Sequence, residues 1–176
     1  MKQILILFGL LILMISCEPE PAMQVSTGLT QGTTYTVKYK GVSRDLSYQI
    51  DSTLLVFDRH LSTYIKTSYI SKWNSGNASG KEHAYFKTVV NRGLKMQQET
   101  NGAFDMTIAP LFALWQMDDE GFIPDSAQID SVLQFVGSDK LSLDSSGSIT
   151  RIDNRIQLDV NAIAQGYAVD VLADLL

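Results

Sequence analysis

Residues 156–170 have the sequence Ile-Gln-Leu-Asp-Val-Asn-Ala-Ile-Ala-Gln-Gly-Tyr-Ala-Val-Asp. The pattern predicts a strand that runs into a helix, with Asp159 at the end of the strand and small residues where the helix starts. Such a junction is suited to anions, because unpaired N–H groups and the positive end of the helix dipole point out of it. Asp159 therefore either contacts a ligand or caps the helix, and Asp is among the best N-cap residues.

The rest of the chain alternates strand-like and helix-like patterns, which predicts an α+β or mixed α/β domain. Ser43 is the predicted N-cap of the first helix, and Ile163, Tyr167, Val171 and Leu175 lie on one face of the last. The expected strand is residues 33–40, the expected helices begin near 43, 87, 129 and 161, and a meander of hairpins is expected over 141–158.

Length and composition fit one folded domain. The chain has 176 residues, of which 45% are hydrophobic and 19% charged, enough apolar material for a single core. Its net charge is −5 and it has no cluster of Lys and Arg, so we expect no nucleic-acid partner.

The N-terminus has the composition of a targeting segment. Lys2 precedes an apolar run over residues 4–15, which is shorter than the ~20 residues that a membrane-spanning helix needs. Cys17 is the single cysteine and follows this run directly, in a context that resembles a bacterial lipobox. We therefore expect residues 1–16 to be a lipoprotein signal peptide, Cys17 to be lipidated, residues 17–30 to be a tether and residues 31–176 to be the domain. The alternative is an ordinary secretory signal that contains a cysteine.

Three further segments combine residues that can receive a ligand. In Gly102-Ala103-Phe104 a small-residue backbone adjoins an aromatic ring, a shape that suits a flat ligand ring. Asp105 lies in an apolar stretch, so it is either a ligand contact or a local cap. Tyr64 follows a short irregular segment and can stack on a ring or pack in the core, and Gln31-Gly32 is a turn that leads into a strand. Gly166 costs a helix ~1 kcal/mol relative to Ala, so we expect the close approach of another backbone or of a ligand to compensate for it.

Taken in order, these segments resemble the ApbE family of flavin transferases. The resemblance rests on Gln-Gly-Thr-Thr-Tyr at 31–35, Leu-Ser-Thr-Tyr at 61–64, Asn-Gly-Ala-Phe-Asp-Met-Thr-Ile-Ala-Pro-Leu at 101–111 and Leu-Asp-Val-Asn-Ala-Ile-Ala-Gln-Gly-Tyr-Ala-Val-Asp at 158–170. It implies an ApbE-like (T-fold-like) domain of which this chain is the N-terminal part.

The resemblance also implies an activity, namely Mg²⁺-dependent transfer of FMN from FAD to a Thr or Ser of an acceptor protein, such as a subunit of a membrane redox complex, with release of AMP. The implied location is the periplasmic side of the inner membrane, where a lipid anchor would hold the protein. By match to the family's motifs, Ala162 would offer its carbonyl to Mg²⁺. The residues that would contact FAD are Gln31, Tyr64, Ala103, Phe104, Asp105, Asp159 and Gln165.

Two alternatives stay open beside the transferase. One is hydrolysis of FAD to FMN and AMP, and the other is a periplasmic lipoprotein that binds flavin without turnover. The remaining residues of the family's metal site have no match in this sequence, so we expect residues 1–176 alone not to catalyse transfer.

Overall fold

The computed structural model describes residues 20–115 and 122–176. The predicted signal peptide over residues 1–16 and the predicted lipidation site Cys17 lie outside these residues. Within the described ranges, no helix combines the length and the apolar character that crossing a bilayer requires.

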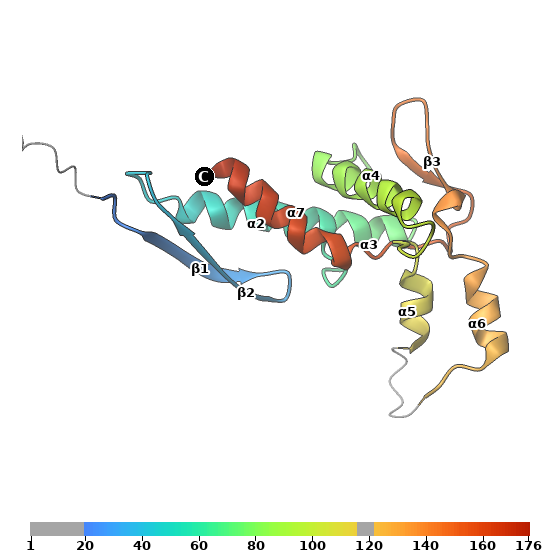
Figure 1. Ribbon diagram of the computed structural model, residues 1–176. Helices are drawn as coiled ribbons and strands as arrows, with labels where there is room; N and C mark the ends of the chain where they lie inside the picture. Colours follow the sequence, from blue (N-terminus) through green and yellow to red (C-terminus); the bar gives the residue numbers. More distant parts are fainter. Residues whose placement is uncertain (1–19, 116–121) are drawn as a thin grey trace, which may run out of the picture.

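An N-terminal hairpin lies at one end of the molecule (Figure 1). Strand β1 (Gln24–Thr30) pairs along its whole length with the antiparallel strand β2 (Thr33–Tyr39). The two-residue loop between them has left-handed backbone at both positions, with φ of 51° at Gln31 and 75° at Gly32. Primed turns of this kind match the twist of paired strands. The predicted tether is therefore wrong over residues 24–30, which form a strand because each of them pairs with a residue of β2. The composition of residues 24–30 alone did not indicate this pairing.

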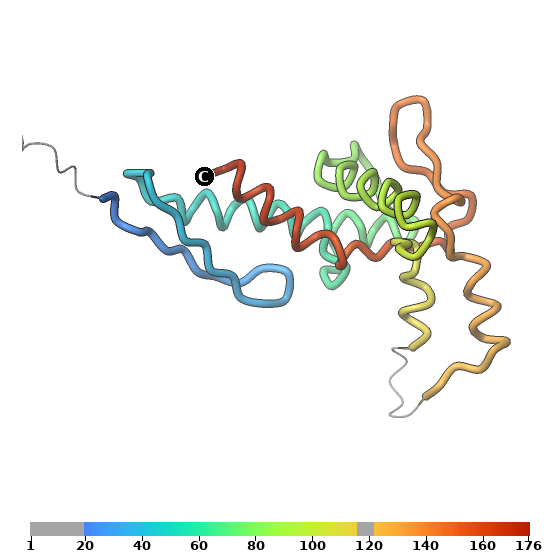
Figure 2. The backbone as a smooth tube through the Cα atoms, viewed as in Figure 1, coloured from blue at the N-terminus to red at the C-terminus, as the bar shows by residue number. Residues whose placement is uncertain are grey.

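Helices α2 (Ser47–Leu61), α4 (Ala84–Glu99) and α7 (Asn161–Leu175) pack against one another, and the short α3 (Tyr69–Asn74) follows α2. The tube view shows α7 returning across α2 toward the hairpin (Figure 2). Helix α2 begins four residues after the predicted cap Ser43, because Asp45 accepts the N–H of Ser47 and ends the preceding turn. The apolar residues that predicted this helix are all buried: Leu46, Ile50, Leu54 and Phe57.

The buried face of α7 is rotated by one residue from the predicted one. Ala164, Ala168 and Leu172 are buried, whereas the predicted face from Ile163 to Leu175 is half-buried. Alanine side chains let the backbones of α7 and its neighbours approach closely, so the small residues form the centre of the contact.

The remaining elements lie at the other end of the molecule (Figure 1). They are α5 (Ala109–Trp115), α6 (Ser126–Leu133), the 3-10 turn η1 (Ser138–Lys140), and the hairpin of β3 (Leu141–Leu143) with β4 (Ile149–Arg151). One hairpin forms where a meander was expected, and the predicted strand before Asp159 is reduced to a single parallel bridge between Ile108 and Gln157. Helices and two small sheets make the mixed α/β fold that the sequence predicts.

Candidate functional site

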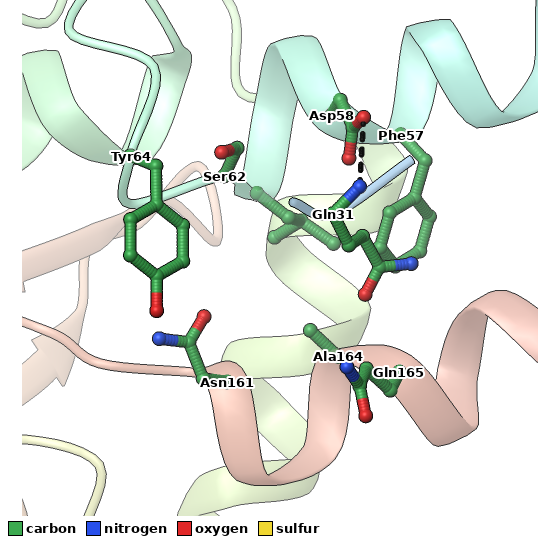
Figure 3. Close-up of a pocket in the computed structure, with 9 residues that line it drawn as sticks. Gln31, Phe57, Asp58, Ser62, Tyr64, Asn161, Ala164 and Gln165 are labelled. Carbon is green, nitrogen blue, oxygen red and sulfur yellow. Dashed lines mark hydrogen bonds between the residues drawn. The ribbon is translucent and has the colours of Figure 1, made fainter. Parts of the chain in front are cut away.

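Two adjacent hollows share Tyr64 and Asn161, and we call them together the Tyr64 site. Figure 3 shows the first of the two. The first hollow, of about 90 Å³, lies between the β1–β2 turn, the end of α2 and the start of α7. The second, of about 190 Å³, lies between the start of α7 and α5. The first is lined by Gln31, Phe57, Asp58, Leu61, Ser62, Tyr64, Asn161, Ala164 and Gln165. The second is lined by Thr63, Tyr64, Asn74, Ala109, Phe112, Ala113, Leu158, Asp159 and Asn161.

Asp58 fixes the β1–β2 turn over the first hollow. Its Oδ2 accepts the backbone N–H of Gln31 at 3.2 Å and the hydroxyl of Thr30 at 3.1 Å. Its Oδ1 is buried and has no hydrogen-bond partner among the described residues. Asp58 thus holds Gln31 at the rim of the hollow.

Tyr64 is the prominent aromatic residue of the site. It is 75% exposed, and its hydroxyl points toward the side chain of Asn161 (Figure 3). The segment that carries it is held by a hydrogen bond from Ser68 Oγ to the carbonyl of Ser62 at 2.6 Å. Asn161 Nδ2 also donates to Thr63 Oγ1 at 3.3 Å. Together with the exposed Phe112 in the second hollow, Tyr64 offers an aromatic face to a flat ligand ring.

Asp159 lies where the second hollow meets the start of α7. Its Oδ1 accepts the N–H of Asn161, the first residue of α7, at 2.8 Å, but Val160 holds the N-cap position and no side chain caps the helix there, so the predicted N-cap role of Asp159 is not found. Gln165 is exposed and lines the first hollow one turn further along α7. Neither hollow has a Lys, Arg or His in its lining.

Asp105 is held by hydrogen bonds to Thr107 and Ser138 and does not line the Tyr64 site. Its carboxylate accepts the N–H and hydroxyl of Thr107, at 2.8 and 2.7 Å, and the N–H and hydroxyl of Ser138, both at 2.8 Å. Burial would raise the pKa of Asp105, but these hydrogen bonds outweigh it and keep the pKa below its usual value. Asp105 thus joins the nearby Thr107 to Ser138, 33 residues further along the chain, which is more than the local cap that the sequence suggested. Ala103 and Phe104 also lie outside both linings, and the FAD contacts predicted for these three residues stay predictions.

The predicted metal ligand Ala162 lies in the first turn of α7, and its side chain lines a different groove, between α4 and α7. Within residues 20–115 and 122–176 no three His, Cys, Asp or Glu side chains group together as a metal site. The contact of Ala162 with Mg²⁺ therefore stays a prediction.

The structure adds residues that the motifs did not single out. Asp58, Asn74 and Phe112 line the Tyr64 site, although none of them stood out by residue type or spacing. Asp58 falls within the predicted first helix, where an acid is unremarkable. Only its contact with the distant turn at Gln31 shows what it does.

Comparisons with known proteins show to which family the chain is similar. Residues 31–176 match the model of the ApbE family. The chain is similar to the FAD:protein FMN transferase of Vibrio cholerae, with 31% identity over 187 residues that cover 100% of this chain and 55% of that protein. It is also similar to the FAD:protein FMN transferase of Haemophilus influenzae, with 28% identity over 92% of this chain and 51% of that protein.

Solved structures match as well. Flavin transferase ApbE from Vibrio cholerae has a TM-score of 0.80 at 28% identity, covering 89% of this chain and 53% of that chain. The apo form of the Pseudomonas stutzeri flavinyl transferase ApbE has a TM-score of 0.79 at 30% identity, covering 90% and 54%. The chain thus spans about half the length of the curated relatives it matches.

Proposed function

This chain belongs to the ApbE family, and we propose that it takes part in the transfer of FMN from FAD to a Thr or Ser hydroxyl of an acceptor protein, with release of AMP. The observation that carries the proposal is the Tyr64 site, in which Gln31, Tyr64 and Gln165 meet in one hollow. The two curated relatives are named for this activity.

The residues of the Tyr64 site fit a part of FAD. Tyr64 and Phe112 present aromatic faces for a flat ring. The amides of Gln31 and Gln165 can bond ring nitrogens or ribose hydroxyls. The lining lacks a cationic side chain that would bind a pyrophosphate directly, so we infer that these hollows hold a ring or ribose end of the ligand.

We infer that the transfer depends on Mg²⁺, because a divalent cation neutralises charge that builds on the pyrophosphate oxygens. The described residues do not complete such a site, so its other ligands have to come from outside them. For the same reason we propose that residues 1–176 alone bind FAD but do not transfer FMN. The second candidate is a lipoprotein that binds flavin without turnover.

The proposed location rests on the sequence of the N-terminus. An apolar run over residues 4–15 followed by Cys17 supports a lipid anchor, with the domain on the periplasmic side of the inner membrane. The acceptor would then be a protein exposed on the same side, such as a subunit of a membrane redox complex.

The test is a titration of the chain with FAD, followed by incubation with FAD, Mg²⁺ and an acceptor protein. We expect quenching of flavin fluorescence on binding, no covalent flavin on the acceptor and no AMP. Replacement of Tyr64 by Ala should weaken FAD binding about 2- to 10-fold, the range typical of an aromatic pair. The matched control is Tyr48→Ala, because Tyr48 is 81% exposed and lines neither hollow.

Each outcome separates the candidates. Covalent flavin on the acceptor would overturn the proposed inactivity of residues 1–176 and show the transferase directly. AMP without an acceptor would show hydrolysis of FAD. Failure of the chain to bind FAD would contradict the proposed function of the Tyr64 site.

A further inference from the structure

The side chain of Asn74 pairs with the backbone of Leu158 through two hydrogen bonds. Asn74 Nδ2 donates to the carbonyl of Leu158 at 2.9 Å, and the N–H of Leu158 donates to Asn74 Oδ1 at 2.8 Å. A neighbouring strand would make the same pair of bonds with its peptide groups. Leu158 is fully buried, so without Asn74 its N–H and carbonyl would lose these partners in the interior.

The opposite edge of the same segment is held by the chain before α5. The N–H of Asp159 donates to the carbonyl of Met106 at 2.7 Å, and Gln157 forms the parallel bridge with Ile108. Successive residues of an extended segment direct their N–H and carbonyl groups to opposite edges. Residues 157–159 are therefore held like a central strand, with the backbone of residues 106–108 on one edge and a single side chain on the other.

Arg151 reinforces the edge that Asn74 occupies. Its guanidinium donates to the carbonyls of Trp73, at 2.6 Å, and of Ile156, and it lies 4.1 Å from the centre of the Trp73 ring. The end of α3 is thus tied to residues 156–158 by two side chains. Asn74 is the one of the two that contacts the residue directly before Asp159.

We propose that Asn74 is a positioning residue for Asp159 and the start of α7. Asn74, Leu158, Asp159 and Asn161 line the second hollow together, so the pairing at Leu158 sets where Asp159 presents its carboxylate. Displacement of a binding group by about 1 Å is enough to lose much of its effect. This inference rests on the proposed binding of FAD at the Tyr64 site.

The side-chain amide of Asn74 donates one hydrogen bond and accepts another, so a variant that removes only the donor tests the proposal. In Asn74→Asp, the carboxylate can still accept the N–H of Leu158, but it has no donor for the Leu158 carbonyl and repels it. Protonation of the new carboxyl restores an O–H donor, and the nearby carbonyl and partial burial raise the pKa of such a group. The variant should therefore recover in acid, which a general loss of packing would not do.

The experiment measures the dissociation constant for FAD at pH 7.5 and pH 5, together with hydrogen exchange at residues 156–159 without ligand. Asn74→Asp should bind FAD about tenfold more weakly than wild type at pH 7.5 and exchange faster there, with both differences smaller at pH 5. The matched control is Asn77→Asp, because the Asn77 side chain is exposed and its amide contacts only Ser75 Oγ, at 3.2 Å. That control should behave as wild type does.

Three results would overturn the inference. Faster exchange with unchanged FAD binding would show that the pairing does not serve the site. Equal weakening at both pH values would show that the missing donor is not the cause. If wild type itself binds no FAD, the proposed function fails and the positioning role fails with it, whereas exchange alone would still report the pairing.

Discussion

His60 and His83 form a stacked pair between the end of α2 and the start of α4. Their ring centres are 4.1 Å apart and the ring planes differ by 10°. His83 Nδ1 accepts the N–H of Tyr85 at 3.2 Å, and a ring nitrogen accepts only when it carries no proton. His60 Nδ1 is buried without a hydrogen-bond partner in the described ranges. Burial, and to a smaller extent the proximity of the His83 ring and of Arg59, lower the pKa of His60 below its usual value.

We expect this pair to make the fold less stable in acid. The unfolded chain takes up a proton on His60 near pH 6.5, whereas the folded protein does so only at lower pH. The unfolded state therefore binds more protons in this range, so the free energy of unfolding decreases as the pH falls from about 8 to 5. Urea unfolding should show a smaller decrease for His60→Gln than for wild type, whereas the exposed-site control Tyr48→Gln should follow wild type. Equal decreases in all three proteins would contradict the prediction.

The Tyr64 site combines residues that the sequence predicted with residues that it did not predict, whose hydrogen-bond partners lie far along the chain. Gln31, Tyr64 and Gln165 belong to motifs that the sequence shows, and the structure brings them together. Asp58 and Asn74 escaped prediction because their partners lie 27 and 84 residues away. No local pattern of side chains encodes such a pairing.

At the scale of the elements, periodicity predicted the buried face of α2 correctly but not those of α6, where no residue is buried, and α7. The spacing of apolar residues in α2 reflects the face that packs in the core. The ends of elements depend instead on single hydrogen bonds, such as the one from Ser47 to Asp45. Strand β1 depends on a partner strand, and the rotated face of α7 depends on which side chains let the helices approach. Those facts belong to the assembled fold.

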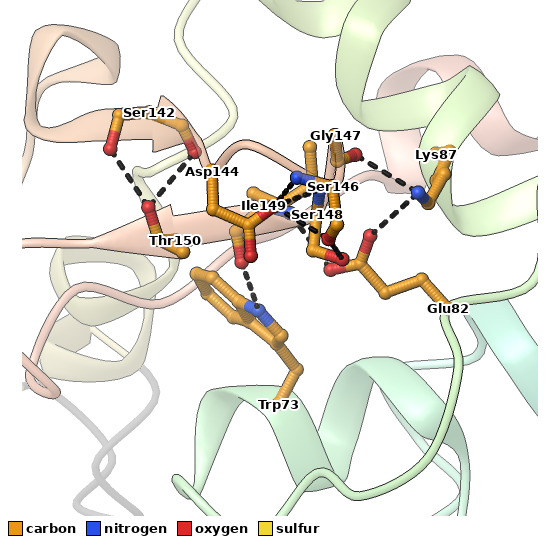
Figure 4. A network of polar contacts seen from close by, with 10 residues as sticks. All are labelled: Trp73, Glu82, Lys87, Ser142, Asp144, Ser146, Gly147, Ser148, Ile149 and Thr150. Atoms are coloured by element: carbon orange, nitrogen blue, oxygen red, sulfur yellow. Dashed lines mark hydrogen bonds and ion pairs between the residues drawn. The ribbon is translucent and has the colours of Figure 1, made fainter.

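Side chains from other elements hold the β3–β4 hairpin in place (Figure 4). The buried carboxylate of Glu82 accepts the N–H of Ile149 at 2.9 Å, and Trp73 Nε1 donates to the carbonyl of Ile149 at 3.4 Å. Lys87 Nζ lies 3.6 Å from Glu82 and donates to the carbonyl of Gly147 at 3.0 Å. A three-residue strand pair is too short to be stable alone, so these contacts hold it against α3 and α4.

We expect Glu82→Ala to lower the free energy of unfolding by about 1–3 kcal/mol, because it leaves the buried N–H of Ile149 without an acceptor. Glu82→Gln keeps an acceptor oxygen and should cost less. The control is Glu99→Ala, which removes an exposed ion pair with Arg92 and Lys95 and should change stability by no more than ~1 kcal/mol. Urea unfolding of the three variants makes the comparison, and equal losses for the Ala and Gln variants at Glu82 would refute the role of the hydrogen bond.

Across the whole molecule, α4 is connected to the Tyr64 site through Met106. Met106 is fully buried, and its carbonyl accepts the N–H of Asp159. Its side chain packs on Gly93 of α4 so closely that a Cβ there would lie 2.5 Å from Met106 Sδ. Gly166 of α7 differs, because a Cβ there would meet no atom within 4 Å among the described residues. The close neighbour expected to compensate for Gly166 is therefore not found in this part of the chain.

These two helical glycines give opposite predictions for the same substitution. Gly93→Ala gains up to ~1 kcal/mol of helix propensity, but displacing the buried Met106 costs about 1–3 kcal/mol, so the variant should be less stable than wild type. Gly166→Ala gains the same propensity and meets open space, so it should be more stable by up to ~1 kcal/mol. Urea unfolding of both variants under one set of conditions measures the difference. Because Met106 also bonds Asp159, Gly93→Ala should in addition increase hydrogen exchange at residues 156–159. If both variants were stabilised equally, Met106 would be able to move without cost, and the connection from α4 to Asp159 would not be rigid.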